Sequence, residues 1–456
     1  MVNRVVVLGA GESGVGAAIL AKAKGIPVFV SDMGQIKDEY KALLMNHAID
    51  FEEGGHTFDR LKDTDLIIKS PGIPETAPII RQLQEYHASL PVISEIEFAA
   101  RYTKAKMICI TGSNGKTTTT SLIYDMLSRA GLDVGLAGNI GNSLALQVAQ
   151  HDREYYVIEL SSFQLDNMYD FRADIAILMN ITPDHLDRYE HNFQNYVNAK
   201  FRITRNQTPD EAFIYWSEDP VINREIERIR PKATLYPFGQ NKHNVAYIDD
   251  SNLVVAAPVA VEPLRVPLEQ LSLQGMHNRL NSMAASLAAQ ILNIRNDVIR
   301  ESLTTFAGVP HRLQYVATVN HIRFINDSKA TNVNSCWYAL ESMTTPTVLI
   351  LGGKDKGNDY SEIDALVREK CHTLVFMGLH NEKLHEHFDS FAQPLTANHS
   401  PLTIIDTDNL RDAVRSAYEA ARPGDTVLLS PCCASFDLFH NYEERGDLFM
   451  NEVRKL

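Results

Sequence analysis

The feature that most constrains this chain is a glycine-containing turn that joins a short apolar run to the start of a predicted helix. The apolar run predicts a buried strand, Gly112 and Gly115 allow the backbone to turn tightly, and Lys116 with Thr117 begins the helix. This order aims several backbone N–H groups and the positive end of a helix dipole at one point. A phosphate chain suits such a point.

Lys116 adds a mobile positive charge to this turn, and the Thr117 hydroxyl is a ligand for Mg²⁺. The pattern departs from the full Walker A motif, because Ile110 stands where the first glycine would be. The alternative is an ordinary strand–turn–helix joint with a surface lysine. A Gly-Lys-Thr sequence directly after a strand favours a nucleoside triphosphate site instead. The expected phosphate contacts are Gly112, Ser113, Asn114, Gly115, Lys116, Thr117 and Thr118.

Length and composition predict about three α/β domains, because 456 residues are too many for one ordinary core. A hydrophobic content of 45% with 22% charged residues is typical of globular proteins, and no apolar run approaches the roughly 20 residues that cross a bilayer. The net charge of −14 disfavours nucleic-acid binding. Five cysteines, including Cys432 and Cys433, show no disulfide framework, so we expect a cytoplasmic protein in which this pair packs beneath a loop.

A second strand–glycine turn–helix unit lies near the N-terminus. Gly9, Gly11 and Gly14 fit the G-x-G-x-x-G pattern, and Asp32 follows the next predicted strand. A Rossmann unit places an acidic residue there to bind a ribose. Taken alone, this weak fingerprint leaves three alternatives, which are a dinucleotide site, a site for another nucleotide diphosphate, and a structural turn.

Predicted strands and helices alternate along the rest of the chain, which argues for doubly wound sheets. We expect three domains in series. They are a Rossmann-like domain at residues 1–95, a central P-loop ATP-binding α/β domain at 96–306, and a Rossmann-like C-terminal domain at 307–456.

Polar residues follow two apolar runs of the central domain, at residues 155–160 and 175–180. Glu159 lies at the end of the first run, where a carboxylate beside a phosphate loop holds Mg²⁺ directly or through water. A helix cap or a salt bridge is the alternative role for Glu159. His185 follows the second run and Lys200 lies in a predicted helix, but local spacing favours a structural histidine and a solvated lysine.

Several blocks taken together resemble the Mur ligases over essentially the whole chain. The blocks are TGSNGKT at 111–117, GNIG at 138–141, ELSSFQL at 159–165, DHLDRY at 184–189, AK at 199–200, GMHN at 275–278, PHR at 310–312, NDSKATN at 326–332 and SPCCASFD at 430–437. The last two are most similar to the members that add D-glutamate. The resemblance implies a UDP-binding N-terminal domain, an ATP-binding central domain, and a C-terminal domain that brings the amino acid.

The implied reaction belongs to cytoplasmic peptidoglycan precursor synthesis. ATP would phosphorylate the terminal carboxylate of UDP-N-acetylmuramoyl-L-alanine, and the amine of D-glutamate would then displace phosphate from the acyl phosphate. A monomer that acts on small molecules, without nucleic-acid partners, is expected. The alternatives are another Mur ligase, a folylpolyglutamate synthase, an NAD(P)-dependent dehydrogenase, and a nucleotide-binding regulatory module.

The resemblance also implies roles for individual residues. Lys116 would bridge the terminal phosphates of ATP, while Thr117 and Glu159 would hold one Mg²⁺. His185 would lie at a second Mg²⁺, and Lys200 would be carbamylated, which turns a cation into an oxygen ligand that a hard metal prefers. Catalytic roles are therefore expected for Lys116, His185 and Lys200.

Binding roles follow from the same resemblance. ATP would contact Asn278, Arg312 and Asp327. The UDP substrate would contact Gly11, Ser13, Gly14, Asp32, Gly72 and Asn139, with Asp32 and Gly72 at the uracil end. Met33 stands where relatives often have a hydroxyl side chain, which leaves the detail of the uracil contact open. D-glutamate would lie among Thr331, Lys356, Ser435, Phe436 and Tyr442, with Lys329 in the same region.

Overall fold

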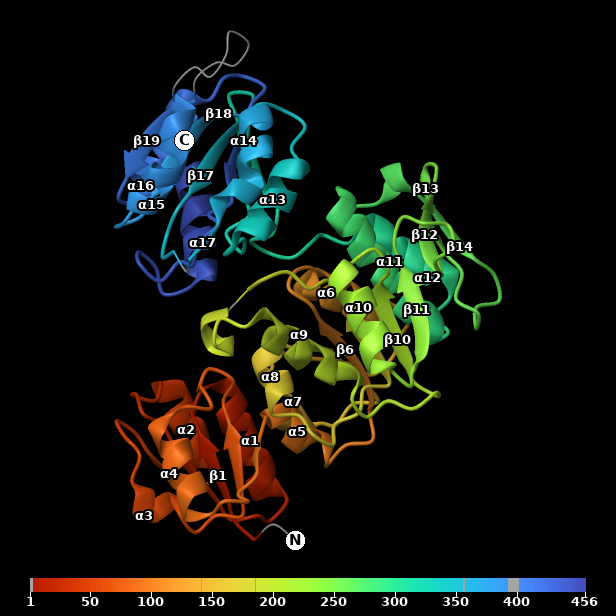
Figure 1. Cartoon of the computed structure of the whole chain (residues 1–456), viewed down its shortest axis with the longest axis vertical. Coiled ribbons are helices and arrows are strands. Elements are labelled where there is room, and N and C mark those ends of the chain that lie inside the picture. The colour runs from red at the N-terminus through yellow and green to blue at the C-terminus, as the bar shows by residue number, and fades with distance from the viewer. Residues whose placement is uncertain (1–2, 141, 185, 356, 393–401) are drawn as a thin grey trace. The chain divides into compact units, whose positions relative to one another are not determined.

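The structure is a computed structural model that describes residues 3–140, 142–184, 186–355, 357–392 and 402–456. Three separate sheets follow one another along the chain, which confirms the predicted three-part α/β architecture (Figure 1). Contacts divide the chain into two compact units, Met1–Leu271 with Arg279–Phe306, and Ser272–Asn278 with Ala307–Leu456. The first two sheets belong to the first unit and the third sheet to the second.

The N-terminal sheet has five parallel strands in the order β3-β2-β1-β4-β5. The strands are β1 (Val5–Leu8), β2 (Val28–Ser31), β3 (Asp50–Glu52), β4 (Leu66–Lys69) and β5 (Val92–Ile93), and the helices are α1 (Glu12–Ala23), α2 (Asp38–Asn46), α3 (Phe58–Leu61), α4 (Pro78–Tyr86) and α5 (Glu95–Ala100). Every residue of β1 is fully buried, because helices cover both faces of a parallel sheet. The loops after β1, β2 and β4 therefore meet at one edge.

The central sheet has nine strands in the order β14-β13-β12-β11-β10-β9-β6-β8-β7. They are β6 (Lys106–Thr111), β7 (Val134–Gly138), β8 (Tyr155–Glu159), β9 (Ile175–Leu178), β10 (Ala212–Trp216), β11 (Thr234–Phe238), β12 (Ala246–Asp249), β13 (Asn252–Val255) and β14 (Leu264–Pro267). The pairs from β7 to β12 are parallel, while β12, β13 and β14 form an antiparallel meander. The loops after β6, β7, β8 and β9 share one edge.

The helices of this region begin with α6 (Lys116–Arg129), which follows the phosphate loop. The others are α7 (Leu144–Gln150), α8 (Ser162–Asp166), α9 (Phe193–Phe201), α10 (Pro220–Ile229), α11 (Met276–Ile291) and α12 (Asn296–Thr305), with 3₁₀ turns η1 (Leu186–Tyr189), η2 (Arg202–Thr204) and η3 (Leu268–Gln270). Lys200, expected in a helix, lies in α9, and the chain after α9 tightens into η2.

The third sheet has six strands in the order β15-β16-β20-β17-β18-β19. They are β15 (Gln314–Val319), β16 (Ile322–Asn326), β17 (Thr347–Leu351), β18 (Cys371–Met377), β19 (Thr403–Thr407) and β20 (Thr426–Leu429), and the helices are α13 (Val333–Glu341), α14 (Asp364–Lys370), α15 (Glu382–Phe388), α16 (Leu410–Ala420) and α17 (Tyr442–Val453), with η4 (Tyr360–Ile363) and η5 (Asp389–Ala392). β15 pairs antiparallel to β16, and the other pairs are parallel. None of the described helices combines the length and apolarity that crossing a bilayer requires.

Candidate functional site

The phosphate loop between β6 and α6 needs glycine at two positions. Gly112 has φ +148° and Gly115 has φ +84°, which are backbone conformations that other residues rarely adopt. A Cβ on Gly112 would lie 2.9 Å from the Cβ of Met179, and one on Gly115 would lie 2.5 Å from Oδ1 of Asn281. The predicted tight turn is therefore fixed by both conformation and packing.

Asn180, two residues after the end of β9, is bonded to this loop. Its backbone oxygen accepts from Ser113 N (2.9 Å), and its side-chain Oδ1 accepts from Asn114 N (2.9 Å) while Nδ2 donates to Asn114 O (3.1 Å). No side chain caps α6, so the N–H groups of its first turn have no acceptor within the helix. This arrangement suits an anion at the helix start.

Two lysines meet at the carbonyl of Gly112. Lys116 Nζ donates to Gly112 O and Ser113 O, both at 2.9 Å, and Lys200 Nζ donates to Gly112 O at 2.7 Å. Lys200 is 2% exposed and lies 4.6 Å from the centre of the Tyr196 ring, so the solvated alternative is wrong. Burial, followed by the charge of Lys116, lowers the pKa of Lys200 well below its usual value. A lysine in this state is an amine nucleophile.

Glu159 ends β8 beside the loop and is 1% exposed. Its Oε1 accepts from Asn139 Nδ2 at 2.9 Å, and its backbone oxygen accepts from Asn139 N at 2.9 Å. The helix-cap alternative is wrong, because Ser161 caps α8. The salt-bridge alternative is also wrong, because the ion pairs among the described residues do not include Glu159. Glu159 Oε2 and Thr118 Oγ1 are buried without a hydrogen-bond partner in the described structure. These hard oxygen atoms fit a magnesium–phosphate group.

A metal site can also be formed by side chains alone. Within the described ranges, no three His, Cys, Asp or Glu side chains gather closely enough to hold a metal ion. A Mg²⁺ here would therefore also draw on hydroxyl, phosphate or water oxygens, as is usual for this ion. His185, predicted at a second ion, lies outside the described residues.

The N-terminal glycine loop forms a second open helix start. A Cβ on Gly14 would lie 1.8 Å from Gly9 O, whereas a Cβ on Gly11 would have no neighbour within 4 Å. Gly11 precedes α1 without a side-chain cap, and Ser13 is half-buried in the first turn. Asp32 fastens the loop, because its carboxylate accepts from Ala10 N (2.6 Å) and Gly34 N (2.8 Å).

The turn after β4 contains Gly72, and two basic side chains stabilise it by donating hydrogen bonds to three successive backbone carbonyls. Arg188 donates to Pro71 O (3.4 Å) and Gly72 O (3.3 Å), and Lys69 donates to Ile73 O (2.6 Å). Lys69 and Arg188 also line a hollow of about 500 Å³. The first unit therefore brings Gly72, Asp32 and the glycine loop to one edge of the N-terminal sheet. Met33, beside Asp32, is exposed.

In the second unit, three loops follow the adjacent strands β16, β20 and β17. Asp327 N donates to Leu429 O (2.8 Å), which pins the first loop to the end of β20. Lys354 and Ala434 exchange two backbone hydrogen bonds, which join the loop after β17 to the loop after β20. Thr331, Ser435 and the residues around position 356 are thus brought to one sheet edge. Lys356 itself lies outside the described residues.

Arg445 is a residue that the sequence analysis missed. It is fully buried in α17 and donates to Ser328 O (2.8 Å), Ser328 Oγ (3.0 Å) and Cys433 O (3.2 Å). It therefore clamps the loop after β16 to the loop after β20. Nothing in its local sequence signals this, because both partners lie far away along the chain.

Asp327 is buried and Arg312 is half-buried near the start of this domain. Asp327 accepts from Leu313 N (3.1 Å) and Ser430 Oγ (2.9 Å), and burial raises its pKa to about 6 against the opposing effect of Arg312. Arg312 Nε and His277 Nδ1 are buried without partners in the described structure. Burial and the charge of Arg312 lower the pKa of His277 to about 3, so its ring is neutral. Asn278 donates to Gln274 O at 2.9 Å.

Two residues predicted near the amino acid lie close together in this unit. Lys329 Nζ lies 5.2 Å from the centre of the Tyr442 ring, so these two predicted residues are neighbours. Ser435 is buried, whereas Phe436 is 66% exposed. Cys432 and Cys433 are free and buried in the core beneath the loop, which confirms the predicted packing role.

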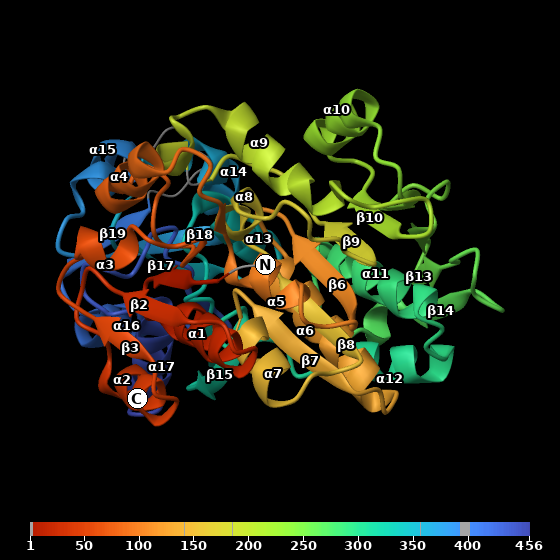
Figure 2. The ribbon, with the colours of Figure 1, turned by 90° about the horizontal axis from the view of Figure 1, so that it is seen from below.

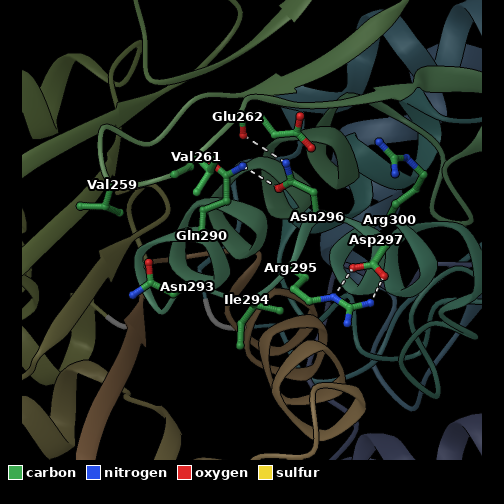
Figure 3. Close-up of a pocket in the computed structure, with 11 residues that line it drawn as sticks. Val259, Val261, Glu262, Gln290, Asn293, Ile294, Arg295, Asn296, Asp297 and Arg300 are labelled. Atoms are coloured by element: carbon green, nitrogen blue, oxygen red, sulfur yellow. Dashed lines mark hydrogen bonds and ion pairs between the residues drawn. The ribbon is translucent and has the colours of Figure 1, made fainter.

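A further hollow of about 440 Å³ lies in the first unit, beside α12 (Figure 3). None of the predicted site residues lines it. Its polar side chains largely bond to one another, as Asn296 does with Gln290 and the Glu262 backbone, and Arg295 with Asp297. It is therefore separate from the candidate site.

Three family models match consecutive parts of the chain. They describe the MurD N-terminal domain at residues 4–78, the Mur ligase middle domain at 110–289, and the Mur ligase glutamate ligase domain at 311–433. The matched regions contain both glycine loops and the loops after β16 and β17.

Similar proteins match from end to end. UDP-N-acetylmuramoylalanine–D-glutamate ligases from Bacteroides fragilis and Porphyromonas gingivalis are 61% and 56% identical, covering 100% and 99% of this chain and 100% and 98% of their own. Among solved structures, UDP-N-acetylmuramate–alanine ligase MurC from Thermotoga maritima shares the fold with a TM-score of 0.63 at 17% identity, covering 100% of both chains. MurF ligase from Thermotoga maritima in complex with ADP has a TM-score of 0.60 at 14% identity, covering 99% of this chain and 98% of its own. The chain therefore belongs to the Mur ligase family, as an ATP-dependent ligase whose full-length relatives include the D-glutamate-adding members.

Proposed function

We propose that this chain joins D-glutamate to UDP-N-acetylmuramoyl-L-alanine, with ATP converted to ADP and phosphate. The observation that carries the proposal is the end-to-end identity of 61% with a ligase of that name. The open phosphate loop, with two lysines at Gly112 O, supports the ATP half of the reaction.

The chemistry needs an activated carboxylate, because a carboxylate is a poor electrophile. The γ-phosphoryl group of ATP passes to an oxygen of the alanine carboxylate, which gives an acyl phosphate and ADP. The amine of D-glutamate then attacks the acyl carbon, loses a proton, and phosphate leaves with its bridging oxygen. Both steps gather negative charge among phosphates, so positioning and electrostatic stabilisation dominate. Lys116 supplies a counter-charge that follows the moving phosphoryl group.

Magnesium and a carbamate are the finer part of the proposal. Thr117 and Glu159 would hold one Mg²⁺, and His185 with a carbamylated Lys200 would hold a second. Bound Mg²⁺ neutralises phosphate charge. The carbamate forms when the uncharged Lys200 amine adds to carbon dioxide and releases a proton. The buried, unpartnered Glu159 Oε2 and the burial of Lys200 support this assignment.

Substrate contacts follow the three sheet edges. In the proposal, Gly11, Ser13 and Gly14 bind the diphosphate, Asp32 and Gly72 lie at the uracil end, and Asn139 contacts the sugar side. The second unit contributes Asn278, Arg312 and Asp327 to ATP, and Lys329, Thr331, Lys356, Ser435, Phe436 and Tyr442 to D-glutamate. We place a monomer with domains at 1–95, 96–306 and 307–456 in the cytoplasm, which suits its five free thiols.

The test is phosphate release by the purified chain with ATP and UDP-N-acetylmuramoyl-L-alanine. We expect release only after D-glutamate is added. Equal turnover with L-alanine or a diamino acid would indicate another Mur ligase. Tight NADH binding without ATP turnover would favour a dehydrogenase, and ATP binding without acyl phosphate would favour a regulatory module.

A further inference from the structure

We infer that Glu12, Glu95 and Ser143 are positioning residues that fasten the diphosphate-binding loop to the segment before α7, in which Asn139 holds Glu159. We call these three residues the Ser143 clasp. The inference rests on the proposed function, because it concerns how one substrate reaches from the first loop to the second. The Ser143 clasp lies within the first unit.

The Ser143 clasp joins three helices at one serine. Ser143 N donates to Glu12 Oε1 at 2.9 Å, and Ser143 Oγ donates to Glu95 Oε1 at 2.7 Å. Glu95 Oε1 also accepts from Ala145 N at 2.6 Å, and Ser143 Oγ caps α7 by accepting from Leu146 N at 3.1 Å. Glu12 begins α1, Glu95 begins α5, and Ser143 precedes α7.

The helices around the Ser143 clasp are closely packed, as Figure 2 shows for α1, α5 and α7. A Cβ on Gly16 of α1 would lie only 2.0 Å from Ser143 Oγ. Ser143 and Glu95 are 3% and 4% exposed. We therefore expect α1, α5 and α7 to move together, because a closely packed interior does not deform continuously.

The charges of the Ser143 clasp are unusual for an ordinary packing contact. Two carboxylates converge on one helix start, and the ion pairs found among the described residues give neither of them a cation. Burial, with a further contribution from the charge of Glu12, raises the pKa of Glu95 to about 7. A buried carboxylate without a cation is costly, so packing alone does not account for it.

Short connections lead from the Ser143 clasp to both loops. Glu12 directly follows Gly11 of the glycine loop, and Asn139 precedes Ser143 by four residues. Asn139 holds Glu159 through its side chain and its backbone N–H, and Asn142 forms a bridge with Ala137. The described links of this path are therefore direct hydrogen bonds, from Ser143 to Glu12 at one end and from Asn139 to Glu159 at the other.

This path has a consequence for the reaction. The substrate's diphosphate would be anchored at Gly11–Gly14, while its carboxylate must meet the γ-phosphoryl group near Glu159. A displacement of about 1 Å between reacting atoms costs roughly 10²-fold in rate. The Ser143 clasp thus determines how accurately an anchored substrate presents its carboxylate.

The experiment compares Glu95→Ala with the matched variant Glu95→Gln in the full-length chain. Glu95→Ala leaves Ser143 Oγ and Ala145 N without their acceptor, whereas Gln keeps an oxygen in place. We expect Glu95→Ala to lower kcat by about 10-fold or more, with the Kd for UDP alone unchanged because the glycine loop stays intact. Glu95→Gln should restore kcat to within about twofold. Ser143→Ala provides a second variant if Glu95→Ala does not fold.

Two outcomes would overturn the inference. The first is a kcat within twofold of wild type for both Glu95→Ala and Ser143→Ala. The second is a UDP affinity that falls in step with kcat, since that indicates general damage to the fold. Wild-type protein that releases no phosphate in response to D-glutamate would instead refute the proposed function, and the UDP titration remains informative in that case.

Discussion

The chain uses the same strand–glycine turn–helix arrangement twice, and the two copies differ in the charges around them. In the N-terminal copy, Gly11 starts α1 without a side-chain cap, and the carboxylate of Asp32 fastens the loop at Ala10. In the central copy, Lys116 and Lys200 both donate to Gly112 O. The backbone arrangement is shared, but among the described residues only the second copy has lysine side chains bonded to its turn.

This difference matches two tasks. A diphosphate that is merely held keeps its charge, and oriented backbone N–H groups are sufficient for that. A phosphoryl group in transfer moves its charge from one oxygen to another, so the site needs counter-charges that act where charge develops. The comparison therefore supports the proposal that the first loop anchors the diphosphate and that the second takes part in phosphoryl transfer.

Replacing Lys116 with alanine should have the largest effect and should separate the two tasks. We expect Lys116→Ala to lower kcat by about 10³-fold or more, because the transferring phosphoryl group loses its mobile counter-charge. The Kd for UDP should not change. Lys106→Ala is the matched control, because Lys106 is exposed and begins β6, the strand that leads into the phosphate loop. A near-normal rate in Lys116→Ala would exclude the transfer role of the second loop.

Lys200→Arg tests the second lysine at Gly112 O. Arginine keeps a positive charge but cannot form the carbamate, so we expect kcat to fall by about 10²-fold. Intact-protein mass in bicarbonate should show one added carbon dioxide in wild type and none in the variant. A fully active Arg variant would make the carbamate untenable and would leave Lys200 as a simple counter-charge.

The sequence was sufficient to predict what is local to each loop. Gly112 to Thr117 and the carboxylate of Glu159 follow strands in the order that the motif requires, and the strands themselves are apolar runs that the structure confirms. The burial of Lys200 was not predictable, because helical periodicity describes only its own segment while its partner is Gly112 O. For the same reason the bonds of Asn180 to the loop and the clamp by Arg445 remained hidden.

Strand order was also beyond the sequence. Alternation of strands and helices predicts parallel sheets, but it does not say that β20, the last strand, inserts between β16 and β17. That insertion places the residues around Ser435 beside those around Thr331. The edge of the third sheet is therefore a product of topology, whereas the glycine loops are products of short motifs.

Alanine substitutions at Gly115 and Gly11 test the comparison of the two glycine loops by their effects on stability. Gly115→Ala places a Cβ 2.5 Å from Asn281 Oδ1 at φ +84°, and we expect it to destabilise the fold by about 1–3 kcal/mol. Gly11→Ala has open space and an ordinary φ of −77°, so its Tm should match wild type. Its KM for the UDP substrate should rise several-fold, because the methyl group stands where the backbone approaches the diphosphate. An equal loss of Tm in both variants would contradict the assignment of Gly11 to ligand approach.

The last effect concerns the dependence of stability on pH at the Ser143 clasp, beside the first loop. The pKa of Glu95 is raised to about 7 in the folded chain, chiefly by burial, from an ordinary value of 4.5. Between these two values the folded chain binds a proton that the unfolded chain releases, so stability falls as pH rises from about 4.5 to about 7 and is then level. The change amounts to at most about 3 kcal/mol.

Glu95→Gln removes the titrating group and should flatten the slope of Tm across this window. The charged and polar groups facing Glu95 are Glu12 of α1 and the Ser143 and Ala145 donors of α7. Glu12→Gln should flatten the slope only in part, because the Glu12 charge is a smaller cause of the raised pKa than burial. Thermal unfolding of wild type and both variants at pH 5, 6, 7 and 8 measures this. An unchanged slope in Glu95→Gln would mean that another group titrates in this pH range. It would also mean that protonation does not affect the region beside the first loop.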